Sequence, residues 1–268
     1  METDNSLSTQ TMSKRKIGFL EPQLWTPKQY LRTKDKITVP PRELISNRTL
    51  DFSLVEKTSV AFQNAPESFA EFDGKAKEVG YTSDQMRVNG CGISALYVVL
   101  KTLSFKKEDI RLSTVGTLAL DVVSMHRNDN VIAGDMRKIG TPVFNLQNGW
   151  YHNALIYEAS KFGVKGERYE DADIIDMSFR MIELQRQNKN PLLVISVGTD
   201  MWLLPHKVGD QSTKHLVVIN GFKYSDESLL EIKATDPYIA GDQPQVVNEL
   251  VKSNKLAALN KKGIIFYT

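Results

Sequence analysis

The spacing of apolar residues divides the chain into a helical first part and a strand-rich second part. Apolar positions at helical spacing predict helices over residues 91–103, 113–125, 134–139, 153–162 and 174–188. After Pro191, short apolar runs predict strands over 192–197, 215–224, 229–236 and 263–267, with one further helix over 246–259. Helices followed by antiparallel strands predict the α+β fold class, with an N-terminal helical half and a C-terminal antiparallel sheet.

Residues at the predicted boundaries agree with this division. Asp173 is suited to cap the start of the helix over 174–188, and Gly163 is suited to end the preceding helix. The polar segment 225–228 separates the strands over 215–224 and 229–236 by a short turn. These two strands are therefore expected to form a hairpin.

The N-terminal part of the chain differs from the rest. Residues 1–16 are polar and are expected to be disordered, and they lack the apolar core of a signal peptide. Residues 17–74 carry apolar residues without a sustained period, and we expect an arm on the domain surface or a pro-segment over an active site. The main domain is expected over 75–268. No apolar run approaches the ~20 residues of a membrane helix, so a cytoplasmic protein is expected, with export by a leaderless route left open.

Composition excludes several classes of function. Apolar residues make up 41% of the 268, charged residues 25%, and the net charge is only +2. This balance predicts a globular protein that binds neither nucleic acid nor a membrane surface through general charge. One cysteine excludes an internal disulfide and a multi-cysteine metal site. His126 with Asp129 and Asp135 has no standard metal spacing, so neither a metal nor a cofactor is expected.

The single cysteine, Cys91, is the strongest candidate for chemistry. It stands between Gly90 and Gly92 at the start of a predicted helix, where the helix dipole and free N–H groups favour a thiolate. A cysteine nucleophile needs a histidine base and a polar group that orients the base. His215 opens one strand of the predicted hairpin and Asp236 ends the other, so the two are expected to face each other.

Two further features bear on carbonyl chemistry at this cysteine. Gln85 lies six residues before Cys91, and its amide could join the Cys91 backbone N–H in stabilising an oxyanion. Gly90 would leave room for a substrate carbonyl to approach the backbone. Trp150, Tyr151 and Trp202 are tentative substrate-binding residues, although each is more often a core residue.

The order Gln85-x5-Cys91-Gly92, then His215, then Asp236-Pro237 resembles the papain-like cysteine peptidases, and most closely the bacteriocin-processing (double-glycine leader) peptidases. The resemblance covers about residues 75–240. It implies a papain-like fold, a Cys91-His215-Asp236 triad, Gln85 as oxyanion residue, and a peptide or protein substrate. The family often has an acidic residue where Gly90 stands and a glycine where Lys214 stands.

Alternatives to a peptidase remain open. The same machinery could transfer an acyl group to an amine, as in transglutaminase-like or amidase chemistry. The chain could instead be a catalytically inactive module of the same fold that binds a peptide. Among the other histidines, His152 is the rival base, while His206 lies in a loop over 198–214 that could contact a substrate.

Overall fold

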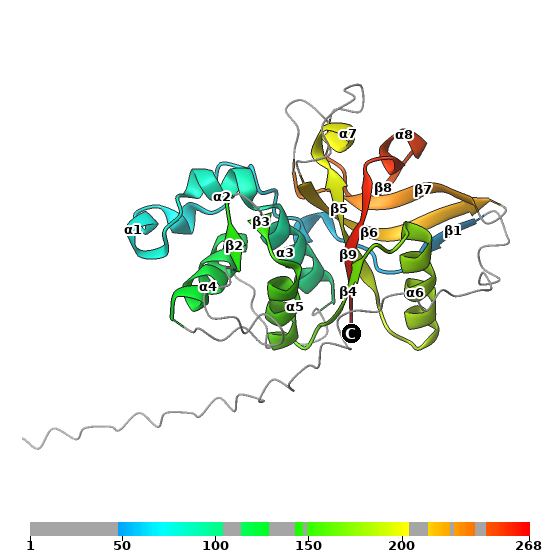
Figure 1. Ribbon diagram of the computed structural model, residues 1–268, viewed down its shortest axis with the longest axis horizontal. Coiled ribbons are helices and arrows are strands. Elements are labelled where there is room, and N and C mark those ends of the chain that lie inside the picture. The colour runs from blue at the N-terminus through cyan, green and yellow to red at the C-terminus, as the bar shows by residue number, and fades with distance from the viewer. Residues whose placement is uncertain are drawn as a thin grey trace, which may run out of the picture.

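The computed structural model describes residues 48–103, 114–128, 143–146, 149–203, 214–225, 228–238 and 245–268 (Figure 1). The helices are α1 (Ala76–Val79), α2 (Ser83–Asn89), α3 (Cys91–Leu103), α4 (Val115–Asn128), α5 (His152–Lys161), α6 (Ile174–Arg186), α7 (Thr199–Leu203) and α8 (Ser253–Leu256). Two 3-10 turns, η3 (Lys57–Ser59) and η4 (Ala70–Phe72), precede them. Among these described segments, no helix has the length and apolar content needed to cross a bilayer.

One large antiparallel sheet organises the described part of the chain. Its strands are β1 (Arg48–Asp51), β4 (Lys165–Glu170), β5 (Leu192–Gly198), β6 (Lys214–Ser225), β7 (Ser228–Thr235), β8 (Glu249–Val251) and β9 (Leu259–Tyr267). The order is β4-β9-β5-β6-β7-β8, and β1 pairs with the second half of β6. Two short strands, β2 (Phe144–Asn145) and β3 (Gly149–Trp150), form a separate ribbon.

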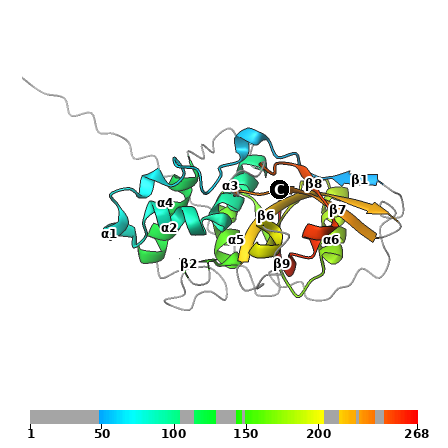
Figure 2. The same ribbon diagram turned by 90° about the horizontal axis from the view of Figure 1, so that it is seen from above.

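The sheet separates two hydrophobic cores, because side chains alternate between the two faces of each strand. On one face Val194, Leu216, Val218 and Ile264 pack with residues of α3, α4 and α5. On the other face the alternate strand residues pack with α6 and α7. Figure 2 shows α3 and α5 on one side of β6 and β9, and α6 on the other.

Helix α3 is the central element of the first core. Ten of its 13 residues are buried, which is why its sequence is apolar on nearly every side. It packs directly on β6, and Figure 1 shows it between the smaller helices and the sheet. The first residue of this helix is Cys91, so the packing of α3 on β6 decides where the cysteine lies relative to that strand.

The predicted α+β plan of helices and an antiparallel sheet is observed, with corrections at both ends. The helix predicted over 246–259 is wrong: β8, the short α8 and the start of β9 occupy these residues. Pairing of β8 with β7 and of β9 with β4 and β5 outweighs the local helical spacing. Strand β4 was not predicted, because its sequence is largely polar. The helix predicted over 134–139 lies outside the described residues.

The domain begins earlier than the predicted residue 75. Strand β1 is part of the sheet, and Phe69 and Phe72 are fully buried in the core with α3 and α4. The segment 48–74 is therefore part of the folded unit and not an arm on its surface. The remainder of the predicted arm, residues 17–47, and the predicted tail, residues 1–16, lie outside the described residues.

Candidate active site

A histidine and an aspartate form a buried ion pair where β6 begins and β7 ends. The Nε2 atom of His215 lies 2.7 Å from Oδ1 of Asp236, and the two residues are only 5% and 2% exposed. The hairpin pairs Val218 with Thr235, so Asp236 lies across from Val217 and not from His215. The offset from the predicted pairing is two residues, which leaves both side chains on one face of the sheet.

The Asp236 carboxylate is held from three directions. Besides the imidazole, the indole N–H of Trp202 donates to Oδ2 at 2.6 Å, and the backbone N–H of Tyr238 donates to Oδ1 at 2.9 Å. The backbone N–H of Asp236 itself donates to the Val246 carbonyl. Because both carboxylate oxygens have donors, the group is fixed in position and its charge is compensated although it is buried.

Trp202, predicted as a tentative substrate-binding residue, is a direct partner of the buried pair. It lies in α7, within the segment expected to be a loop, and its side chain is 0% exposed. A side chain that is fully buried offers no surface to a substrate in this structure, whereas its N–H contacts Asp236 directly. Nothing in the sequence pattern pairs Trp202 with Asp236, since 34 residues separate them.

Cys91 lies close to this pair, because its side chain is among the groups that raise the pKa of the His215 imidazole. Nε2 of that imidazole is occupied by Asp236, so Nδ1 is the nitrogen left for the sulfur. Burial by itself would lower the pKa of His215, but the Asp236 carboxylate and Cys91 together raise this pKa to about 10. The imidazole is therefore protonated at neutral pH, and a protonated imidazole stabilises a neighbouring thiolate.

Gln85 lies one helix before the cysteine, near the start of α2. Its side-chain oxygen accepts from the Thr82 N–H at 2.9 Å, while its own N–H donates to the Thr82 hydroxyl at 3.2 Å. These reciprocal bonds form a capping box at the start of α2. They use the carbonyl side of the amide, so Nε2 is the atom that would have to serve as an oxyanion donor.

The two glycines beside Cys91 are explained by packing. A Cβ atom on Gly90 would lie 2.5 Å from the Phe69 ring, and one on Gly92 would lie 2.6 Å from Trp150. Gly90 is buried, so the acidic residue common in the resembled family has no space here. Both glycines permit close approach of aromatic side chains to the start of α3, in addition to any room they leave for a substrate.

Trp150 and Tyr151 lie beside the start of α3. Trp150 is 6% exposed, and its indole N–H donates to the Asn89 carbonyl at 2.9 Å. It therefore supports the junction between α2 and α3, and its role in substrate binding stays a prediction. Tyr151 is half-buried, with its hydroxyl accepting from the Asn145 amide at 3.0 Å, and its role in substrate binding stays a prediction.

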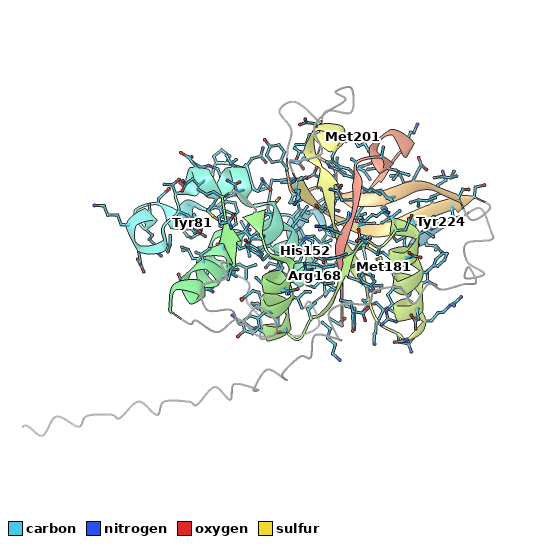
Figure 3. All side chains as sticks on the ribbon, in the orientation of Figure 1. Tyr81, His152, Arg168, Met181, Met201 and Tyr224 are labelled. Atoms are coloured by element: carbon cyan, nitrogen blue, oxygen red, sulfur yellow. The ribbon has the colours of Figure 1, made fainter. Side chains whose placement is uncertain are left out.

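His152, the rival base, is at the start of α5 and belongs to a different environment. Burial and the nearby cations Arg168, Lys262 and Lys214 lower the pKa of this histidine to about 4, so it is neutral at pH 7. Figure 3 shows His152 and Arg168 near each other where α5 meets β4. The buried histidine with a carboxylate partner is His215. His206 and the side chain of His126 lie outside the described residues.

Gln63 is a site-supporting residue that sequence reasoning missed. Its side-chain amide donates to the carbonyls of Arg87 and Val88 near the end of α2, at 3.2 and 3.3 Å. Its backbone N–H donates to the Pro237 carbonyl at 2.8 Å. Gln63 therefore links the helix that leads to Cys91 with the segment that follows Asp236. A glutamine in a non-periodic segment carries no sequence signal for such a contact.

The described residues contain no candidate set of ligands for a metal ion. No group of three or more His, Cys, Asp or Glu side chains within these ranges could hold a metal ion.

Comparisons with known proteins give distant structural similarity only. No family model matches the chain, and no curated protein matches it. A crystal structure from Bacillus anthracis, described as a "putative C39-like peptidase", is similar over 66% of this chain and 88% of its own length. The sequence identity is 16% and the TM-score is 0.37.

Proposed function

We propose that the protein is a thiol hydrolase, and specifically a cysteine peptidase that uses Cys91 as nucleophile. The observation that carries the proposal is the buried pair of His215 and Asp236, 2.7 Å apart, with the Cys91 sulfur at the same imidazole. A cysteine with a base and an oriented carboxylate is the arrangement that covalent acyl chemistry requires. An inactive module that only binds a peptide would have no need to keep these three groups together.

In the proposed mechanism the Cys91 thiolate attacks the carbonyl carbon of the scissile amide. The negative charge that develops on the carbonyl oxygen is stabilised by the Cys91 backbone N–H and by Nε2 of Gln85, each worth roughly 3–4 kcal/mol in well-studied enzymes. His215 then protonates the leaving amine as the C–N bond breaks. Water, deprotonated by the neutral imidazole, attacks the thioester, and the acid product leaves with the thiolate restored.

Three residues would act by positioning the triad. Trp202 and the Tyr238 N–H hold Asp236 so that its Oδ1 faces Nε2 of His215. Gln63 holds the end of α2 against the segment after Asp236, and thereby fixes the separation between the nucleophile and its base. If this separation changes by about 1 Å, the reaction rate can fall on the order of 10²-fold.

Alkylation of Cys91 at low pH tests the proposal. Ordinary thiols, with a pKa of about 8.5, react slowly with iodoacetamide near pH 6. We expect Cys91 to react at least ~10-fold faster than free cysteine there, because the protonated imidazole stabilises the thiolate. Intact mass spectrometry follows the reaction, and His215→Ala should abolish the advantage.

The matched control is His126→Ala, since His126 belongs to α4, a helix to which none of the proposed catalytic residues belongs. It should retain the fast alkylation. Slow labelling of the wild type, or fast labelling that survives His215→Ala, would contradict an activated thiolate. Cys91→Ser confirms that the single labelled residue is the cysteine.

A further inference from the structure

The sheet face that packs against α5 carries a row of cations beside the proposed active site. Its members are Arg168 on β4, Lys262 on β9 and Lys214 on β6, and His152 at the start of α5 faces them. We call these four residues the basic face. We propose that the basic face binds a carboxylate of the peptide substrate, which makes acidic peptides the preferred substrate class. This inference rests on the function proposed above.

The strand register places the three cations on one face of the sheet. Arg168 pairs directly with Ile264, which packs in the core with α3 and α5. Lys262 is two residues before Ile264, and Lys214 is two residues before Leu216, another member of that core. Because side chains alternate along a strand, all three point to the side on which α5 lies. Both lysines are exposed and can reach a ligand in solvent.

Arg168 has an unused donor in this row. Its Nη1 donates to the Asn153 side chain at 3.1 Å, and its Nη2 pairs with Glu170. The remaining Nε–H is buried and has no hydrogen-bond partner in the described structure. A buried donor without an acceptor is costly, and a ligand oxygen at this position would satisfy it.

His152 contributes a neutral donor rather than another charge. The three cations and its burial keep its imidazole unprotonated at pH 7, so one ring nitrogen donates and the other accepts. The one carboxylate in contact with the cations of the basic face that we identify is Glu170, which pairs with Arg168. Within the described residues neither Lys262 nor Lys214 forms an ion pair, although Glu170 lies across from Lys262 in the strand register, so both charges can attract an anion.

The basic face adjoins the proposed catalytic residues on both sides. Lys214 immediately precedes His215 on β6, so their backbones are adjacent while their side chains point to opposite faces of the strand. On the helical side, His152 follows Trp150 and Tyr151, and Trp150 packs against Gly92 next to Cys91. A peptide held with its scissile carbonyl at Cys91 could therefore place a nearby carboxylate among these cations. Charge-assisted hydrogen bonds to such a carboxylate are stronger than neutral ones.

Peptidyl electrophiles with and without a negative charge test this inference. The probes are N-acetylated trialanine chloromethyl ketones in which one alanine at a time is replaced by Glu or by Gln. We expect that at one position the Glu probe labels Cys91 about 10-fold faster than the Gln probe, the ratio that a net ~1.4 kcal/mol provides. The ratio should fall as salt rises from 0.05 to 0.5 M, because the lysines are exposed.

Variants of the basic face identify the residues responsible. Lys262→Gln and Arg168→Gln should each reduce the Glu-to-Gln ratio toward 1, and Lys262→Gln keeps the test valid if Arg168→Gln fails to fold. The matched control is Lys77→Gln in α1, which removes an exposed charge elsewhere and should keep the ratio. Equal rates for Glu and Gln probes at every position, or a ratio that Lys262→Gln and Arg168→Gln do not change, would overturn the inference.

The carboxylate could also be the C-terminus of a peptide. To separate a C-terminal carboxylate from an acidic side chain, tetra-alanine and its C-terminal amide are compared in how well each protects Cys91 from iodoacetamide. Failure of the two proposals is distinguishable. One result is a faster reaction of the Glu probe, which supports the carboxylate site. If His215→Ala leaves the labelling of Cys91 by iodoacetamide unchanged at the same time, the catalytic mechanism is contradicted while the carboxylate site is kept.

Discussion

The Asp236 carboxylate shows how much a single side chain depends on its immediate partners. It is 2% exposed and accepts from an imidazole, an indole and a backbone N–H. An ionised group taken out of water is tolerated only when its hydrogen-bonding capacity is used. The proposed role of Asp236 in orienting His215 therefore rests on Trp202 as much as on its own position in the chain.

Trp202→Phe tests this dependence. The phenyl ring retains most of the apolar contact, but Oδ2 of Asp236 loses its donor. We expect the free energy of unfolding to fall by about 1–3 kcal/mol, as for a buried acceptor left unsatisfied. The pH dependence of Cys91 alkylation should shift as well, because Asp236 is then held less firmly against His215. Denaturation by urea and alkylation rates from pH 5 to 10 measure the two effects.

Trp150→Phe is the matched control, because it also removes a buried indole N–H, in this case one that donates to the Asn89 carbonyl. It should lower stability without the same shift in the alkylation profile. If Trp202→Phe leaves the pH dependence of Cys91 alkylation unchanged, Trp202 has a purely structural role.

The raised pKa of His215 also predicts how stability varies with pH. The folded pKa of about 10 lies above the unfolded value of about 6.5, so folding favours the protonated imidazole. This contribution is fully present below pH 6.5 and is lost as pH rises through 10. We expect the stability advantage of the wild type over His215→Gln to decrease steadily over that window. Urea denaturation at intervals between pH 6 and 10 measures it, and an advantage that grows with pH would contradict the assignment.

At the scale of the element, the junction between α2 and α3 is determined by close aromatic packing. Phe69 occupies the space beside Gly90, and Trp150 occupies the space beside Gly92. The first turn of α3 is thereby fixed between two rings, and with it the backbone N–H and sulfur of Cys91. Small residues at these two positions are a requirement of the packing and not merely a feature of the turn.

Gly90→Asp, which introduces the acidic residue common in the resembled family, should therefore be harmful. Its Cβ would meet the Phe69 ring and the Met86 carbonyl, so either the ring or the start of α3 must move. Overpacking of this kind costs about 1–3 kcal/mol, and a buried carboxylate adds to it. Thermal unfolding measures the loss. The control is Gly74→Asp, at a position with open space around it, which should cost less although its φ is +77°.

At the scale of the whole molecule, the site depends on the contact of α3 with β6. Cys91 begins a helix of the first core, while His215 lies near the start of β6 and Asp236 directly follows β7. Strand β1 adds to this arrangement. It pairs with residues 221–224 of β6, which follow the residues that pair with β5, and it places Leu50 in the second core. The N-terminal strand therefore supports the strand that carries His215.

Removal of β1 should destabilise the protein and not simply uncover the site. A chain that starts at residue 53 lacks all pairs between Arg48–Asp51 and β6, whereas one that starts at residue 47 retains them. We expect the shorter chain to unfold at a lower urea concentration. Equal urea midpoints for the two chains would show that β1 contributes nothing, and alkylation of Cys91 in both separates stability from access to the site.

The sequence by itself determined the local features of this protein. The helical spacing over 91–103 predicted α3, the cap at Asp173 predicted α6, and the apolar runs with a short turn predicted the hairpin of β6 and β7. These features depend on residues close together in the chain, so their pattern is visible without the fold. The choice of Cys91, His215 and Asp236 as site candidates followed from their places on those elements.

Only the tertiary structure decided the contacts between distant segments. The bond from Trp202 to Asp236, the link through Gln63, the space beside Gly90 and the gathering of cations around His152 all join residues from different elements. The same holds for residues 246–259, where pairing with β7 and β5 replaced a locally plausible helix by strands. Such contacts depend on strand register and on the packing of α3 against β6. The free energy of both arises only in the assembled sheet and core, and no single segment supplies it.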